Sequence, residues 1–110
     1  MAKAQPTSEE TLNKIREFAP KLMELTDGTL FGDVWERPGL SKRDRSLITV
    51  AALVALYRTN ELPGHLVRAQ KNGVSKDELV ELMTHLAFYA GWPSAMTAVK
   101  IAMDVLTDAE

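Results

Sequence analysis

Three residues near the middle of the chain combine the side chains that acid–base chemistry on an anionic substrate requires. Arg58, Glu61 and His65 are spaced by three and four positions and directly follow an uncharged stretch, residues 46–57. Because four positions make about one helical turn, Glu61 and His65 can share a helix face and form a hydrogen bond. A carboxylate partner fixes the tautomer of a histidine and raises its pKa, as a proton donor requires. We therefore predict that His65 donates a proton and that Glu61 supports it.

Each of these residues also has a purely structural interpretation. His65 can be a packed or half-exposed helix residue without a catalytic role, and Glu61 can simply complement a helix dipole from the first turn. Arg58 lies just after the uncharged stretch, and Arg45 lies just before it. Either arginine can hold a substrate carboxylate through two hydrogen bonds, and either can instead form an ordinary ion pair.

A second group of candidates, His85, Tyr89 and Trp92, lies close to the small residues Ala90 and Gly91. His85 stands between apolar residues, which is typical of a core or interface histidine. Tyr89 and Trp92 likewise suit a core or an interface better than the wall of a pocket. We keep the three as weaker candidates for substrate binding.

The composition excludes several kinds of chemistry. The chain has no cysteine, which excludes a disulfide framework, a catalytic thiol and any cysteine-based zinc site. Its two histidines are too few for a convincing metal site, so we predict no metal. It also lacks a glycine-rich phosphate loop and the Gly-x-Ser-x-Gly motif of serine hydrolases.

Charge and hydropathy restrict the partners of this 110-residue chain. Its net charge of −2 gives no electrostatic signature for nucleic acid or for an anionic membrane. The uncharged stretch is shorter than the roughly 20 residues needed to span a bilayer. The first ten residues lack the apolar core of a signal peptide. We predict a cytoplasmic protein that binds neither nucleic acid nor membranes.

The spacing of apolar residues predicts an all-α fold of about five to six antiparallel helices. No segment shows the two-residue alternation of a strand. We expect one compact helical domain over residues 8–107, preceded by a flexible tail of residues 1–7.

Breaking and capping residues divide the first half of this helical chain. Pro20 should interrupt an N-terminal amphipathic helix, and Asp27 with Gly28 should end it. A short helix should end before Pro38. Ser41 should then cap the next helix, with an acidic residue three positions later.

The helix that begins after Ser41 is apolar on all sides between Leu47 and Tyr57, with Thr49 as its main polar residue. Such a helix is expected to be buried on all sides. Because a domain this small can hardly surround a helix, part of its surface should meet another subunit. We therefore predict a homo-oligomer.

Three further helices are expected in the second half. Thr59 or Asn60 can cap the first of them, Pro63 suits its first turn, and Gly73 should end it. A full capping box, residues 75–78, should begin the second. Residues 91–93 should end the second of these helices, and a last helix should follow over residues 94–106.

Four sequence blocks together resemble the carboxymuconolactone decarboxylase family. They are residues 31–39, 45–47, 58–66 and 85–93, and the resemblance extends over roughly residues 22–106. The resemblance implies an all-α subunit that assembles into ring-like oligomers. These are commonly hexamers built as trimers of dimers, so a trimer or a hexamer is expected here.

The same superfamily contains a redox branch, similar to the alkylhydroperoxidase partner protein, which uses Cys-x-x-Cys and a following histidine on one helix. His65 matches that histidine, whereas Arg58 and Glu61 stand where the cysteines would be. An upstream acidic residue of that branch falls at Ser46. The decarboxylase branch matches better, because it carries arginine, glutamate and histidine at these places.

The resemblance implies a cofactor-free decarboxylase that acts on 4-carboxymuconolactone or a related small lactone carboxylic acid. Arg58 or Arg45 would hold a carboxylate, His65 would deliver a proton to carbon, and Glu61 would orient and charge His65. The other polar candidates, His85 and Tyr89, would serve as weaker pocket donors from a neighbouring subunit.

Two alternatives to this reaction stay open. The decarboxylases of aromatic catabolism usually have a longer N-terminal arm than this chain, which leaves room for a different substrate. The second candidate function is an oligomer that binds small acids or catalyses another reaction. The third, a peroxidase-like redox protein, is disfavoured because the chain has no cysteine.

Overall fold

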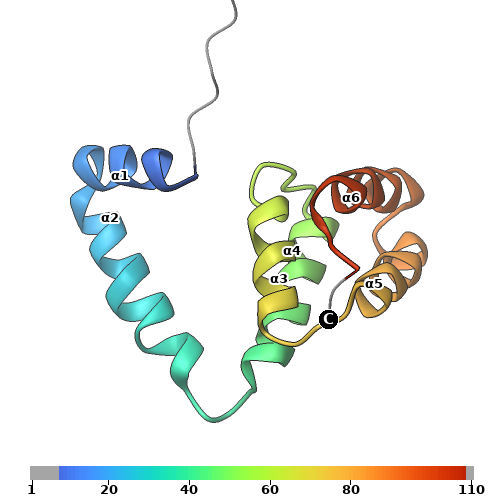
Figure 1. Ribbon diagram of the computed structural model, residues 1–110, viewed down its shortest axis with the longest axis horizontal. Coiled ribbons are helices and arrows are strands. Elements are labelled where there is room, and N and C mark those ends of the chain that lie inside the picture. The colour runs from blue at the N-terminus through green and yellow to red at the C-terminus, as the bar shows by residue number, and fades with distance from the viewer. Residues whose placement is uncertain (1–7, 109–110) are drawn as a thin grey trace, which may run out of the picture. The chain divides into compact units, whose positions relative to one another are not determined.

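The computed structural model describes residues 8–108, which divide into two units between Pro38 and Gly39 (Figure 1). Residues 1–7, expected to form a flexible tail, lie outside the described residues. Six α-helices and two short helical segments make up the described part of the chain, which contains no strand. The all-α prediction is therefore confirmed, while the expectation of one domain over residues 8–107 stays a prediction.

The first unit begins with two helices that meet at Ala19. Helix α1 spans Ser8–Phe18 and helix α2 spans Pro20–Leu25. Proline suits the first position of a helix, because its missing N–H has no partner there in any case. The predicted interruption at Pro20 is confirmed, and the two helices meet at an angle (Figure 1).

The helical segment does not end at Asp27 and Gly28, so that prediction was wrong. The chain continues through a π-helical segment, Thr26–Phe31, and then a 3-10 segment, Val34–Glu36. The glycine signal misled because glycine also tolerates helical backbone when the helix widens to a π turn. A side chain at Gly32 would lie 2.7 Å from the carbonyl oxygen of Gly28, which explains why residue 32 is glycine.

Few apolar side chains of the first unit are buried. Met23 and Trp35 are buried, and the Trp35 ring contacts that of Phe31 with centroids 5.8 Å apart. In contrast, Phe18 is 93% exposed and Leu22 is 59% exposed. The apolar stripe that predicted the helix thus remains largely open to solvent in a single chain.

The second unit contains four helices: α3 (Lys42–Ala55), α4 (Leu62–Lys71), α5 (Lys76–Tyr89) and α6 (Trp92–Val105). They pack as the pairs α3–α4 and α5–α6, with further contacts between the pairs. All four helices and the loop after α4 supply the core: Val50, Val54, Leu62, Leu66, Ala69, Val74, Leu79, Met83, Ala98 and Ala102.

Serine caps begin two of these helices, as predicted. The Ser41 hydroxyl accepts a hydrogen bond from the backbone N–H of Asp44 at 3.0 Å. At the start of α5 the capping box is complete, because Ser75 and Glu78 each bond the backbone of the other, at 3.1 and 3.0 Å. Each cap satisfies backbone N–H groups that a helix start leaves unpaired.

Helix α4 begins differently from the prediction. Its N-cap residue is Glu61, which makes no capping bond with its side chain, and neither Thr59 nor Asn60 occupies that place. Pro63 lies in the first turn, as expected. Thr59 and Asn60 lie in a separate turn that continues through Glu61, so the helix starts at Leu62.

Helix α3 ends in a left-handed residue that is not glycine. Tyr57 has φ of 60°, and its N–H bonds the carbonyl of Val54 at 3.2 Å. The next N–H, of Arg58, bonds the carbonyl of Leu53 at 2.8 Å. This pair of bonds is the Schellman pattern, which usually has glycine at this place, and Gly73 provides that residue at the end of α4.

Helix α3 is not covered all round within one chain. Val50 and Val54 are buried, but Ile48 on the same helix is 56% exposed. The expectation of a helix buried on all sides is therefore not met by the described residues of a single chain.

Candidate active site

The structure brings Arg58, Glu61 and His65 together around the start of α4. Arg58 and Glu61 are exposed, and His65 is half-buried. The carbonyl of Arg58 accepts the N–H of Leu62 at 3.2 Å, and the carbonyl of Glu61 accepts the N–H of His65 at 3.4 Å. The predicted spacing of one helical turn between Glu61 and His65 is thus realised in the backbone.

One ring nitrogen of the His65 imidazole, Nδ1, is buried and has no hydrogen-bond partner among the described residues. The predicted hydrogen bond from His65 to the Glu61 carboxylate is therefore not formed at this nitrogen. A buried polar atom without a partner is costly, and such atoms are often found where a ligand or a reaction uses them.

The pKa of His65 lies below its ordinary value. Burial is the largest cause, because it disfavours the charged imidazolium, and the positive charge of Arg68 acts in the same direction. Glu61 acts in the opposite direction but is outweighed. The expected raising effect of Glu61 on the pKa of His65 is thus present. The expected net rise was wrong, because burial and Arg68, which both lower this pKa, were not considered.

Replacing Arg68 by glutamine should raise the pKa of His65 toward its ordinary value, because removing a nearby positive charge eases protonation. Glu61→Gln should shift the same pKa further down. An NMR titration of the His65 ring protons measures both shifts. Lys71→Gln, which removes an equal charge one turn further along α4, should have a smaller effect. An unchanged pKa in Arg68→Gln would contradict the role given to Arg68.

Arg45 does not lie with the other three candidates. The amide of Asn72, at the end of α4, donates a hydrogen bond of 2.9 Å to the hydroxyl of Ser46, near the start of α3. The two helices therefore run antiparallel, and His65, in the first turns of α4, lies toward the opposite end of the pair. Arg45 is half-buried next to Ser46. Ser46 itself is buried and joins the two helices, so it has a structural role here.

The aromatic candidates are largely exposed. His85 and Tyr89 stack on α5 with centroids 4.8 Å apart, and Tyr89 is 78% exposed. Trp92 is 58% exposed and meets Phe88 edge to face at 5.5 Å. These residues are not part of the core of a single chain, so the core interpretation was wrong for them and the interface interpretation stays a prediction.

Sequence reasoning missed Arg68, which lies three positions after His65 on the same helix. That spacing places the two side chains next to each other on the surface of α4. The signal was therefore present in the sequence, but only the acidic neighbour of His65 was considered.

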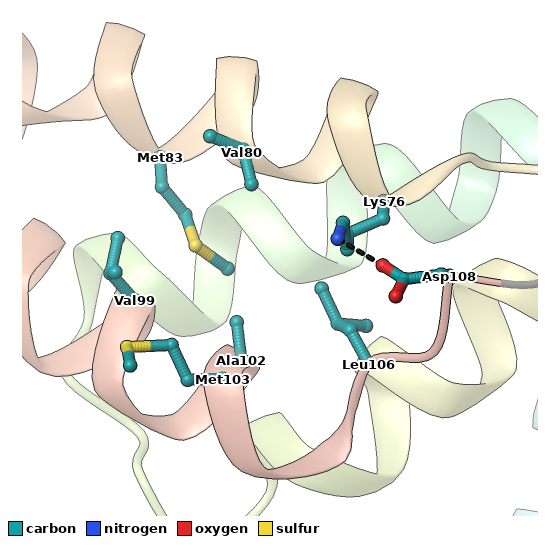
Figure 2. A pocket seen from close by; sticks show the side chains of 8 residues that line it. All are labelled: Lys76, Val80, Met83, Val99, Ala102, Met103, Leu106 and Asp108. Atoms are coloured by element: carbon teal, nitrogen blue, oxygen red, sulfur yellow. Dashed lines mark hydrogen bonds and ion pairs between the residues drawn. The ribbon is translucent and has the colours of Figure 1, made fainter.

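The main hollows of the second unit lie elsewhere. One of them, of about 400 Å³, lies between α5, α6 and the residues that follow α6 (Figure 2). Neither this hollow nor the two smaller ones, of about 340 and 130 Å³, is lined by Arg58, Glu61 or His65.

Two further features of the described part of the chain concern ligands and membranes. Within residues 8–108, no group of three or more histidine, aspartate or glutamate side chains gathers in a way that could hold a metal ion. Over the same residues, every helix is too short or too polar to cross a membrane.

The comparisons with known proteins agree on one class. The model of the carboxymuconolactone decarboxylase family matches residues 20–104. The 4-carboxymuconolactone decarboxylase of Acinetobacter baylyi is 41% identical over 98 residues, which cover 89% of this chain and 73% of the relative. The nitrosuccinic acid decarboxylase npaB of Metarhizium robertsii is 33% identical over 100 residues, which cover 91% of this chain and 70% of the relative.

Both relatives are decarboxylases, which defines this chain as a decarboxylase and thus as an enzyme whose substrate carries a carboxyl group. The chain belongs to the carboxymuconolactone decarboxylase family. The resemblance seen in the sequence is confirmed, and so is the enzyme class that it implied.

Proposed function

We propose that this enzyme removes carbon dioxide from 4-carboxymuconolactone or a closely related lactone carboxylic acid, with His65 as the proton donor. The observation that supports this assignment most directly is the half-buried imidazole whose Nδ1 atom has no partner, one turn after Glu61. The name of the Acinetobacter baylyi relative supports the substrate class.

The reaction needs no covalent bond to the protein. The carbon–carbon bond to the carboxylate breaks, and its electron pair moves through the neighbouring double bond to the lactone carbonyl, which becomes a dienolate. Carbon dioxide leaves, and His65 delivers a proton to carbon. Arg58, exposed in the turn before α4, would hold a carboxylate of the substrate and favour the developing negative charge.

The lowered pKa of His65 fits this scheme when the charge of the substrate is included. In the free enzyme the imidazole tends toward its neutral form. An anionic substrate beside the ring favours the imidazolium, because an opposite charge raises the pKa of a histidine. The proton would thus be taken up with the substrate and then passed to its carbon.

Incubating the purified chain with 4-carboxymuconolactone, and separately with nitrosuccinate, tests the proposal. We expect release of carbon dioxide with the lactone, measured as substrate loss and gas formed. Nitrosuccinate is included because the second relative acts on it. Turnover of nitrosuccinate alone would contradict the lactone assignment. Turnover of neither compound would contradict the lactone assignment and would also exclude nitrosuccinate as a substrate.

We further propose that the chain forms a ring-like homo-oligomer, a trimer or a hexamer, in the cytoplasm. The exposed apolar side chains around the junction of α5 and α6 support this proposal, since Phe88 and Met96 are 75% and 49% exposed beside the exposed ring of Trp92. Exposed apolar surface of this kind often marks a protein–protein contact. Light scattering should give a multiple of the 12.2 kDa chain mass, and a monomer would contradict the proposal.

A further inference from the structure

The hollow between α5 and α6 has no part in the reaction proposed above. We call it the α5–α6 hollow. It combines an apolar wall with one cation and one anion at its edge (Figure 2). Its volume of about 400 Å³ lies within the range of small-molecule sites. The lining residues are Lys76, Val80, Met83, Val99, Ala102, Met103, Leu106 and Asp108.

The wall of the α5–α6 hollow comes from both helices. Figure 2 shows Met83 of α5 and Leu106, just after α6, pointing into the space between the helices. Met83 is fully buried, whereas Met103 is 78% exposed. One side of the hollow is therefore part of the core, and the other opens to solvent where a ligand can enter.

The cation at the edge of the hollow is already paired with a carboxylate of the same chain. The ammonium of Lys76, the first residue of α5, forms an ion pair with Asp108. The side chain of Asp108 is 89% exposed, so solvent weakens this pair. The neighbouring backbone is held independently, because Gln70 exchanges two hydrogen bonds with Thr107, at 2.9 and 3.2 Å. Asp108 can therefore leave Lys76 while Thr107 stays in place.

We propose that the α5–α6 hollow binds a small amphipathic carboxylate, whose apolar part lies against Met83 and Leu106 and whose carboxylate replaces that of Asp108 on Lys76. The chain's own carboxylate acts as a competitor that covers the cation when the site is empty. This site shares no lining residue with the proposed active site.

Local charge favours an anion with a single charge. Lys76 is the only cation among the described residues of the lining, and it interacts with Asp77 as well as with Asp108. A multiply charged anion such as a phosphate would meet these two carboxylates and only one ammonium. A singly charged carboxylate with an apolar tail matches both the edge and the wall.

The test uses octanoate and its neutral counterpart 1-octanol, titrated into the full chain and followed by NMR. Octanoate should shift the signals of Val99, Met103 and Leu106. Lys76→Gln should weaken octanoate binding by about two- to fivefold, because an exposed ion pair is lost. Asp108→Asn should strengthen it by a similar factor, since the competitor is removed. Neither variant should change the binding of 1-octanol.

A third variant separates the wall from the cation. Met103→Asp places a carboxylate in the exposed part of the wall, so it should weaken the binding of both octanoate and 1-octanol. The proposal is wrong if Asp108→Asn fails to strengthen octanoate binding, or if the shifted signals lie away from the hollow. An equal effect of Lys76→Gln on octanoate and 1-octanol would also overturn it. None of these measurements depends on decarboxylation, so the outcome is independent of the proposed reaction.

Discussion

Replacing His65 by alanine should reduce the kcat of decarboxylation by about 10²- to 10⁴-fold, the usual contribution of a general acid. The fold half-buries the imidazole of His65, and this burial lowers its pKa. Without it, the dienolate must take its proton from water, which is a weaker and less well-placed acid. Substrate loss and carbon dioxide formation, measured at saturating substrate, give the kcat values to compare.

Two controls make the His65 result specific. Val67→Ala changes a partly exposed residue two positions later on the same helix and should keep nearly full activity. A urea unfolding curve for His65→Ala shows whether the variant is folded at the assay temperature. A folded His65→Ala enzyme with normal turnover would show that another group delivers the proton.

Arg58→Gln should lower kcat/KM by about 10- to 100-fold, because a hydrogen bond to a charged group contributes about 1.5–3 kcal/mol. Glutamine retains part of the length of arginine but lacks both its charge and its two-pronged contact with a carboxylate. Much of the loss should appear in KM, since the carboxylate is bound before it leaves. Steady-state kinetics with the lactone measure the two parameters separately.

Arg45→Gln is the matched comparison for Arg58→Gln. Arg45 lies by Ser46, which is hydrogen-bonded to the far end of α4 from His65. The same change at residue 45 should therefore have a smaller effect on KM. A larger loss in Arg45→Gln than in Arg58→Gln would assign the anchoring role to Arg45 instead.

Much of the second unit could be predicted from local sequence signals. Ser41 and Ser75 begin their helices as expected, because a capping bond involves residues only three positions apart. Gly73 ends α4 for an equally local reason. The wrong end at Gly28 and the missed N-cap Glu61 have the opposite origin. There the backbone follows a wider helix or a longer turn, for which sequence signals are weak.

The sequence predicted how Glu61 and His65 lie relative to each other but not the electrostatics around His65. The spacing of Glu61 and His65 predicted their placement on neighbouring helical positions, because helix geometry is regular. The pKa of His65 depends on how much of the ring the rest of the unit covers and on the balance with Arg68. Burial depends on tertiary packing, which the spacing of residues does not contain.

The left-handed backbone of Tyr57 restricts which residues evolution or a selection experiment can place there. Glycine and asparagine adopt φ near 60° with little or no strain, whereas β-branched residues and proline do not. Substitution by valine or isoleucine would disturb the turn that positions Arg58 and Glu61 before α4. Position 57 should therefore tolerate small, flexible residues and reject several apolar ones, although its own side chain is 56% exposed.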